Sequence, residues 1–245
     1  MAKIHIGTSG WNYKHWLGRF YPEKIRPADM LSFYLQHFST VELNNSFYHL
    51  PSVKSFRNWH QTVPDNFIFA VKGSRFITHM KKLKAPKTST RKFFTRVEKL
   101  EEKLGPILFQ LPPHWKINVP RLGTFLERMP GQYRYAFEFR EQSWFTERVY
   151  ELLRQHQAAL CIYHMSGYET PMEVTANFVY VRFHGAQSTY GGSYSESQLK
   201  AWAERIAYWR EQGKEVFAYF NNDPEAHAIA NAKSLARFLG QTSGV

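Results

Sequence analysis

Short runs of apolar residues alternate along the chain with longer segments in which apolar residues recur every three or four positions. The short runs predict strands, and the longer segments predict helices whose apolar faces cover a sheet. The predicted strands are 3–7, 40–44, 67–72, 107–111, 135–140, 159–163, 178–184 and 216–221. Strands that alternate with helices favour a parallel sheet. Eight of them in 245 residues predict an α/β fold, one TIM-type (β/α)8 barrel that spans 1–245 as a single domain.

Residue types at the ends of the helical segments support this order. Ser195 and Gln198 form a capping box that opens the seventh helix, and Gly213 ends it. We expect Gly105–Pro106 to stop the third helix and Asp223–Pro224 to open the last one. About fourteen residues separate the sixth and seventh strands, fewer than a helix with two loops needs. The sixth helix is therefore expected to be reduced or missing.

Composition narrows the class of protein. Apolar residues make up 43% of the chain and aromatic residues 17%, too many for a disordered protein. No apolar run is long enough to cross a bilayer, and residues 1–7 lack the continuous apolar stretch of a secretory signal. The single Cys161 lies in an apolar run and is interpreted as a buried, inert thiol. We expect a cytoplasmic protein without disulfides or a membrane partner.

The net charge of +12 is concentrated in one segment. Residues 72–103 contain eleven Lys or Arg and three Glu, which gives 11 − 3 = +8 of that total. One interpretation is a solvated helix face that aids solubility. The other is attraction of an anionic partner, such as a phosphate-bearing molecule or nucleic acid. The charge by itself leaves both open.

Polar residues also lie on the strand positions that face the barrel interior. Side chains alternate along a strand, so the apolar phase of each strand marks its outward side. The polar residues on the opposite phase, near the carboxyl ends of the strands, are Glu42, Asn44, Lys72, Gln110, Glu138, Arg140, Arg182 and His184. In the last strand the inward pair is either Tyr219 with Asn221 or Phe220 with Asn222. Active sites of such barrels lie at this end, so the cluster predicts a ligand site; the alternative is a structural ion-pair network.

Loops at the same end add to the prediction. The loop at 73–90 brings much of the basic segment to the mouth of the barrel, which favours an anionic partner. The loops at 185–193 and 221–223 lie where barrels commonly bind phosphate. Aromatic residues such as Trp11 and Tyr190 lie in the first and seventh loops. Packing explains most of these aromatic residues, and the remainder could stack on a base or a sugar.

Several sequence blocks form a specific combination. They are GTSGW at 7–11, VELNNSFYHLP at 41–51, FAVKGSRFITH at 69–79, GPILFQLPP at 105–113, FEFREQSW at 137–144, YVRFHG at 180–185, YGGSY at 190–194 and AYFNND at 218–223. Together they resemble the YecE-like family, domain of unknown function 72, across essentially the whole chain. The resemblance implies a barrel with a pocket that uses Glu42, Asn44, Lys72, Gln110, Glu138, Arg140, Arg182, His184, Tyr190 and Asn222. It implies no reaction. Ser46, His49 and Ala226 depart from the Thr, Arg and Gly that the family leads us to expect.

The first expected function is an enzyme that binds a phosphate-bearing or otherwise anionic ligand at the carboxyl ends of the strands. Glu42 or Glu138 would act as general acid or base, and His184 would exchange a proton near neutral pH. Lys72 would add a point charge or, alternatively, a Schiff-base amine. The ligand contacts would come from Trp11, Asn44, Gln110, Arg140, Arg182, Tyr190 and Asn222, with the two arginines clamping the anion. Phosphodiester hydrolysis and glycosidic hydrolysis are both compatible with these residues.

The alternative is a non-catalytic nucleic-acid-binding protein. The basic surface of residues 72–103 would follow phosphates, aromatic residues at the rim would stack on bases, and binding would depend steeply on salt. No cofactor is expected. Metal chemistry ranks third, because the chain has no His-Glu-x-x-His pattern and no paired Cys ligands. His49, His79 and His184 would have to gather in space to bind a metal ion.

Overall fold

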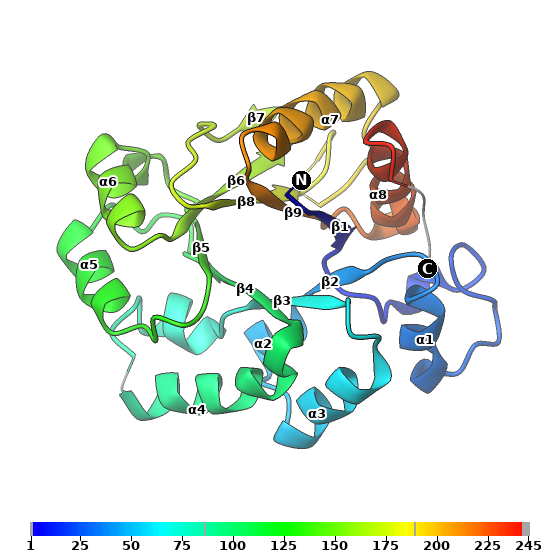
Figure 1. The fold of residues 1–245 in the computed structure, drawn as a ribbon, viewed down its shortest axis with the longest axis horizontal. Coiled ribbons are helices and arrows are strands. Elements are labelled where there is room, and N and C mark those ends of the chain that lie inside the picture. The colour runs from blue at the N-terminus through cyan, green and yellow to red at the C-terminus, as the bar shows by residue number, and fades with distance from the viewer. Residues whose placement is uncertain (1, 86, 189, 242–245) are drawn as a thin grey trace.

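The computed structural model describes residues 2–85, 87–188 and 190–241, and its strands form a ring surrounded by helices (Figure 1). The strands are β1 (Ile4–Thr8), β2 (Thr40–Leu43), β3 (Ile68–Lys72), β4 (Leu104–Gln110), β5 (Tyr135–Glu138), β6 (Ala159–Met165), β7 (Tyr168–Glu169), β8 (Phe178–Phe183) and β9 (Glu215–Phe220). All eight predicted strands are confirmed. The additional β7 is a two-residue antiparallel strand beside β6.

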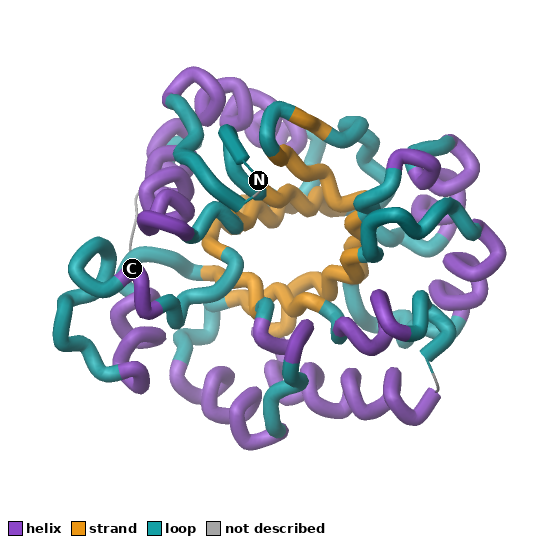
Figure 2. Tube along the Cα trace, turned by 180° about the vertical axis from the view of Figure 1, so that it is seen from behind, coloured by secondary structure: helices purple, strands orange, loops and turns teal. Residues whose placement is uncertain are grey.

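The eight long strands run parallel in the order β2-β3-β4-β5-β6-β8-β9-β1. Seen from behind, they form a nearly closed ring (Figure 2). One bridge between Ser9 and Glu42 joins β1 to β2 and closes the ring. Gly7 is required at this seam, because a Cβ atom there would lie 2.3 Å from the backbone oxygen of Thr40. The fold is therefore the predicted TIM-type α/β barrel.

Helices cover the outside of the ring. They are α1 (Met30–Tyr34), α2 (Asn45–Tyr48), α3 (Val53–Thr62), α4 (Lys87–Val97), α5 (Val119–Glu127), α6 (Glu147–Gln155), α7 (Glu196–Glu211) and α8 (His227–Phe238). Shorter 3-10 helices lie at Lys14–Trp16, Pro27–Asp29, Glu98–Lys103, Gln142–Trp144 and Pro224–Ala226, and a π-helix at Phe76–Met80. The chain between β6 and β8 forms β7 and no helix. This confirms that the helix expected after the sixth strand is missing; the helix labelled α6 precedes that strand.

The predicted helix ends are partly right. The capping box of Ser195 and Gln198 opens α7, and Gly213, with a φ of 75°, follows its end. The prediction for Gly105–Pro106 is wrong, because both residues lie inside β4. The β3–β4 ladder shifts register between Phe69 and Val71, and such an irregularity tolerates a proline without an N–H group.

The opening of the last helix is displaced by one turn. Asp223 and Pro224 begin a 3-10 turn, and α8 starts only at His227. Ala226 separates the two helical segments with a left-handed φ of 59°. Glycine adopts this conformation without the steric cost that a Cβ atom brings. The family resemblance led us to expect glycine at this position, and the conformation gives the physical reason.

Two apolar clusters fill the molecule. The larger one packs the outward faces of the strands against the helices. The smaller one fills the barrel interior below the polar cluster and includes Ala70, Leu108, Ala136, Cys161, Tyr180, Phe217 and Tyr219. This confirms the predicted inward phase, and it makes Tyr219 rather than Phe220 the inward residue of the last strand. No helix among the described residues is both long and apolar enough to span a membrane.

Candidate functional site

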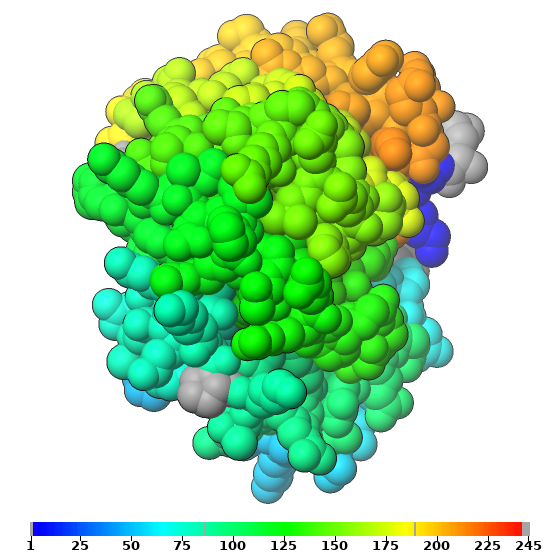
Figure 3. Space-filling model, turned by 90° about the vertical axis from the view of Figure 1, so that its left-hand side faces the viewer, coloured from blue at the N-terminus to red at the C-terminus, as the bar shows by residue number. Residues whose placement is uncertain are grey.

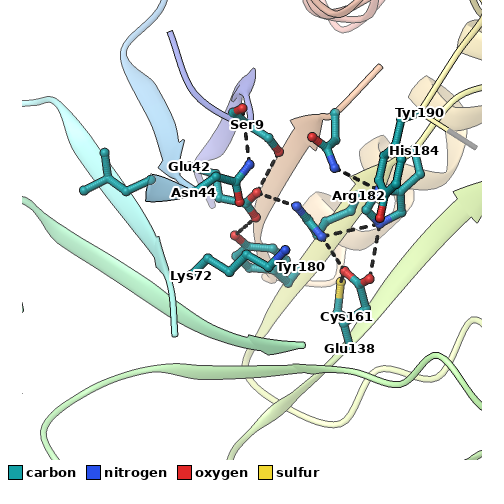
Figure 4. Close-up of polar contacts among 12 residues, drawn as sticks. Ser9, Glu42, Asn44, Lys72, Glu138, Cys161, Tyr180, Arg182, His184 and Tyr190 are labelled. Carbon is teal, nitrogen blue, oxygen red and sulfur yellow. Dashed lines mark hydrogen bonds and ion pairs between the residues drawn. The ribbon is translucent and has the colours of Figure 1, made fainter. Parts of the chain in front are cut away.

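Most of the predicted polar residues meet at the carboxyl ends of the strands (Figure 4). Arg182 of β8 lies at their centre, and its side chain is completely buried. Its Nη2 donates to Glu42 Oε1 at 2.7 Å, and its Nη1 donates to Glu138 Oε2 at 2.7 Å. One guanidinium group thus joins the two predicted catalytic carboxylates. Both of its terminal nitrogens bind protein carboxylates, which argues against the expected bidentate clamp on a ligand.

Glu42 of β2 is held by side chains from two other parts of the barrel, the end of β1 and β8. Its Oε1 also accepts a hydrogen bond of 2.6 Å from Ser9 Oγ, and its Oε2 accepts one of 2.6 Å from Tyr180 Oη. With Arg182, these contacts connect β2 to the end of β1 and to β8. Glu42 is fully buried, so the carboxylate lies at the seam of the barrel and stabilises its closure.

The second half of the cluster centres on Glu138 of β5. Arg140 Nε donates to Glu138 Oε1, and Arg140 Nη2 donates to His184 Nε2 at 2.8 Å. The guanidinium group of Arg140 also lies over the ring of Tyr163, with Cζ 4.8 Å from the centroid. Tyr190 is the exposed neighbour, at 39% exposure, with its hydroxyl 3.5 Å from Arg140 Nη2. The cluster therefore reaches the surface through Arg140 and Tyr190.

Electrostatics fix the protonation states of this half. Burial opposes ionisation of Glu138, but Arg140 and Arg182 hold its pKa well below the usual range. Burial, with Arg182 and Arg140 nearby, lowers the pKa of His184 to about 3 despite the opposing charge of Glu138. His184 is consequently a neutral imidazole at pH 7. The prediction that it exchanges a proton near neutral pH is wrong, because two guanidinium groups lie against a fully buried ring.

Lys72 behaves differently from the other cations of the cluster. Its Nζ lies 4.4 Å from the centroid of the Phe47 ring, and no carboxylate of the described residues lies within ion-pair distance of it. Burial, and then Arg182, lower its pKa to about 7, although Glu138 and Glu42 oppose this. Ser46 Oγ donates to the backbone oxygen of Lys72 at 2.6 Å. Ser46 stands where the family resemblance led us to expect Thr, and it provides the same hydroxyl group. Lys72 is thus an amine that changes charge near neutral pH.

Further cations gather beside Lys72 at the mouth of the barrel. Burial, followed by the charges of Lys72, Arg75 and Arg140, lowers the pKa of His79 to about 4. The His79 ring also packs edge-on against Phe47, with centroids 5.0 Å apart. Arg75 is exposed and, in the part of the chain that the structure describes, makes no ion pair. The mouth therefore carries a local positive potential.

Three amide side chains of the predicted site have a buried oxygen without a hydrogen-bond partner. These atoms are Asn44 Oδ1, Gln110 Oε1 and Asn222 Oδ1. Asn44 Nδ2 donates to the backbone oxygen of Ser9 at 3.3 Å, and Gln110 lies in register with Glu138 on the neighbouring strand. A buried polar atom without a partner costs free energy, so these three oxygens are positions at which a ligand could donate hydrogen bonds.

Two predicted ligand contacts lie outside the cluster. Trp11 packs in the outer apolar core, where its ring meets Trp59 edge-on at 5.5 Å. Asn222 Nδ2 donates to the backbone oxygen of Gly192 and to Asn231 Oδ1, each at 2.9 Å. Asn222 thus ties the loop before α7 to α8.

Three residues of the cluster were not predicted as site residues. Ser9 and Tyr180 hydrogen-bond Glu42, and Asn221 Nδ2 lies 3.1 Å from His184 Nδ1. Tyr180 lies on the inward phase of its strand, and Asn221 lies on one of the two phases that the sequence left open for the last strand. Ser9 lies beyond the end of β1, where strand alternation gives no information.

The basic segment of residues 72–103 does not form one surface. Lys72 belongs to the interior cluster, and Arg75 to the mouth. Arg96 Nη1 donates to the backbone oxygens of Leu50 and Pro51, and Lys103 is buried. The remaining exposed cations lie on α4 and the loop before it. The exposed cations of the segment are therefore those of the mouth, of α4 and of the loop before it, and nucleic-acid binding by them stays a prediction.

The predicted histidines do not gather around a common point that would suit a metal ion. Within residues 2–85, 87–188 and 190–241, one group of three potential ligands is close enough to share an ion: His60, Glu101 and Glu102. His60 Nε2 already pairs with Glu102 Oε1 at 3.0 Å, and both glutamates are exposed. The group includes none of His49, His79 and His184.

The fold and the site define a class, a TIM-type barrel with an ion-paired polar cluster at the carboxyl ends of its strands. A family model described as "Protein of unknown function DUF72" matches residues 5–245, and the chain belongs to this family. The UPF0759 protein YunF of Bacillus subtilis (strain 168) is 28% identical over 96% of this chain and 94% of YunF. YecE of Escherichia coli (strain K12) is 29% identical over 59% of this chain and 51% of YecE.

Solved structures agree with the fold. A DUF72 family protein from Thermotoga maritima MSB8 superposes with a TM-score of 0.88 at 32% identity, over 98% of this chain and all of that one. A DUF72 family protein from Enterococcus faecalis V583 gives a TM-score of 0.78 at 20% identity over 99% of both chains, which supports the fold alone. The resemblance seen in the sequence is thereby confirmed, and the family name carries no reaction.

Proposed function

We propose that this protein is an enzyme that binds a small anionic substrate at the mouth of the barrel and uses Lys72 to exchange a proton with it. The observation that carries the proposal is the gathering of Lys72, Arg75 and Arg140 around His79. Of these cations, Lys72 and Arg75 have no ion-pair partner within the described residues. Cations that the protein leaves unpaired beside a buried cluster favour an external anion.

The chemistry of the cluster supports a role for Lys72 in proton exchange. An amine whose pKa lies near 7 is about half neutral at physiological pH, so it can act as a general base or as a nucleophile. Glu138 stays ionised and His184 stays neutral under the same conditions. The glutamates and the histidine would therefore set the field around Lys72 and hold Arg140 and Arg182 in position.

This arrangement discriminates between the two hydrolytic reactions. Glycosidases place the scissile bond between two carboxyl groups. Here the guanidinium group of Arg182 binds both Glu42 and Glu138, and all three side chains are completely buried. The geometry argues against glycosidic hydrolysis. Phosphodiester cleavage remains a prediction, with Lys72 in the role first given to His184.

The binding part of the proposal is tested by thermal unfolding of the full chain at low ionic strength. The probes are inorganic phosphate, glycerol phosphate and pyruvate. We expect at least one to stabilise the protein by on the order of 2–3 kcal/mol at a hundredfold excess over its Kd. Arg75→Ala should abolish this stabilisation, because it removes an exposed cation of the mouth. Arg148→Ala is the matched control, an exposed arginine of α6. Equal stabilisation in both variants, or none in the wild type, contradicts the proposal.

The chemical part is tested on the Lys72 amine. Acetic anhydride labels only neutral amines, so the labelling rate as a function of pH reports the pKa of each lysine. Mass spectrometry of the digested protein should give a midpoint near 7 for Lys72. The exposed Lys92 is labelled in the same experiment as the reference lysine. A midpoint for Lys72 as high as that of Lys92 would remove it as the proton-exchanging group.

A further inference from the structure

A cavity of about 590 Å³ lies between α4 and α5, away from the polar cluster. On the face shown in Figure 3, the cyan-green of α4 borders the green of α5. Helix α4 packs against α3, and α5 packs against α6, while the seam between α4 and α5 stays open. The volume falls in the range of small-molecule sites, roughly 300–1,000 Å³. We name this cavity the α4–α5 groove.

The floor of the α4–α5 groove is apolar and partly aromatic. Leu83, Phe94 and Phe125 line it and are buried. The ring of Phe94 stacks on that of Tyr133, with centroids 5.4 Å apart and an interplanar angle of 4°. Two parallel rings beside aliphatic side chains form a wall suited to a flat or aliphatic molecule.

The rim of the groove is basic. Lys87 and Arg91 lie one turn apart on α4, and Arg128 follows the end of α5; all three are exposed and line the cavity. None of the three makes an ion pair within the described part of the chain. The carboxylate that lines the groove, Glu98, lies 3.2 Å from Lys99 Nζ. Three cations are therefore free to meet an external anion.

The orientation of α4 strengthens this positive field. The helix begins at Lys87, and its first turn contains no acidic residue. The amino end of a helix carries a partial positive charge, which normally favours acidic residues there. A lysine at this end adds to the partial charge instead of offsetting it. An anion beside Lys87 and Arg91 would relieve this unfavourable arrangement.

We propose that the α4–α5 groove binds a small amphipathic anion, a molecule with an aromatic or aliphatic body and one phosphate, sulfonate or carboxylate group. The body lies on the floor formed by Phe94, Tyr133 and Leu83, and the anionic group pairs with the rim cations. This site is separate from the mouth of the barrel, so its occupation does not depend on the proposed enzymatic function.

The test uses the full chain and anilinonaphthalene sulfonate, an aromatic sulfonate that fluoresces in apolar surroundings. We expect saturable binding that Arg91→Glu weakens more than about tenfold, since it removes a rim cation and adds a repulsive charge. The matched control is Lys92→Glu, the same change of charge on the same helix at a residue that does not line this groove. We expect less than about a twofold effect there. Equal weakening by both variants would mean attraction by net charge and would overturn the site.

A second variant tests the apolar floor without changing the charge. Thr95 is exposed and lines the groove, so Thr95→Trp should fill it and abolish dye binding. Dye binding that survives this change overturns the proposal. Inorganic sulfate that displaces the dye with an affinity equal to that of the dye also overturns it, because the apolar floor would then contribute nothing. A single-stranded oligonucleotide is compared with a mononucleotide in the same assay. Far tighter binding of the oligonucleotide would overturn the proposal of a small ligand and indicate a nucleic acid instead. Phosphate binding at the mouth should persist in Arg91→Glu, which separates the two proposals.

Discussion

Lys103 and Lys72 are buried lysines at the two ends of the same basic segment, but they have opposite surroundings. Lys103 Nζ donates to the backbone oxygens of His60 and Val63, each at 2.8 Å, and lies 3.4 Å from the carboxylate of Asp65. Lys72 Nζ faces the Phe47 ring and has no carboxylate within ion-pair distance among the described residues. Burial is similar, at 3% and 9% exposure, so the difference lies in the partners.

The comparison separates a charge that supports the fold from one that the fold tolerates. A buried charge is stable only when acceptors replace the water it loses, and Lys103 has three. Lys72 instead lies near Arg182 and Arg140, whose charges disfavour its ammonium form. Such a destabilised group is typical of functional sites, where stability is exchanged for reactivity. The same distinction applies to Arg182 and Arg75, and it predicts that their removal changes the free energy of unfolding by different amounts.

The largest effect is expected at Arg182. Arg182→Met should lower the free energy of unfolding by about 3–5 kcal/mol, because it leaves Glu42 and Glu138 buried without their common partner. Arg75→Met, at the exposed mouth, should change it by less than about 0.5 kcal/mol. Urea unfolding at pH 7 measures both. A small effect at Arg182 would mean that the carboxylates find other partners, and the division between supporting and tolerated charges would fail.

A smaller effect is expected at His184 and depends on pH. Its pKa is about 3 in the folded protein and about 6.5 in the unfolded chain, so the unfolded chain binds the extra proton between these values. Acid therefore destabilises the fold in this window. Between pH 6.5 and 4.5, the free energy of unfolding should fall by about 2–3 kcal/mol less in His184→Gln than in the wild type.

The upper part of that window isolates the histidine. The pKa of Glu138 is lowered, so its contribution is present above its unfolded value, roughly 4.3, and is lost only below it. His49→Gln, at an exposed position, is the control and should follow the wild type. Parallel curves for His184→Gln and the wild type would mean that the folded protein also protonates His184.

Strand alternation predicted the fold and the composition of the cluster for a physical reason. Side chains alternate along a strand with a period of two residues. Once the outward apolar phase is known, this period places the side chains of Lys72, Glu138 and Arg182 inside the barrel. All three lie inside, as predicted. The short connection between β6 and β8 likewise excluded a helix because of its length.

Pairing within the barrel could not be predicted, because it depends on distances between strands that are far apart in sequence. Alternation places Arg182 inside but does not state that it joins Glu42 to Glu138. The protonation states of His184 and Lys72 follow from the same distances. Both interpretations of the basic segment treated Lys103 as a surface cation, because its carbonyl acceptors lie at the end of α3, more than one element away. The sequence thus predicts which groups are available, and the register decides which of them are paired.

The most direct test of the comparison replaces each buried lysine by methionine, which keeps the length of the side chain and removes the charge. Lys103→Met should destabilise the fold by about 2 kcal/mol, because two buried backbone oxygens lose a charged donor. Lys72→Met should be neutral or stabilising by up to about 1 kcal/mol, because it removes an amine that burial disfavours. Urea unfolding at pH 7 gives both signs in one experiment. A loss of stability at Lys72 equal to that at Lys103 would show that Lys72 supports the fold, and the argument for its function would then have to rest on anion binding alone.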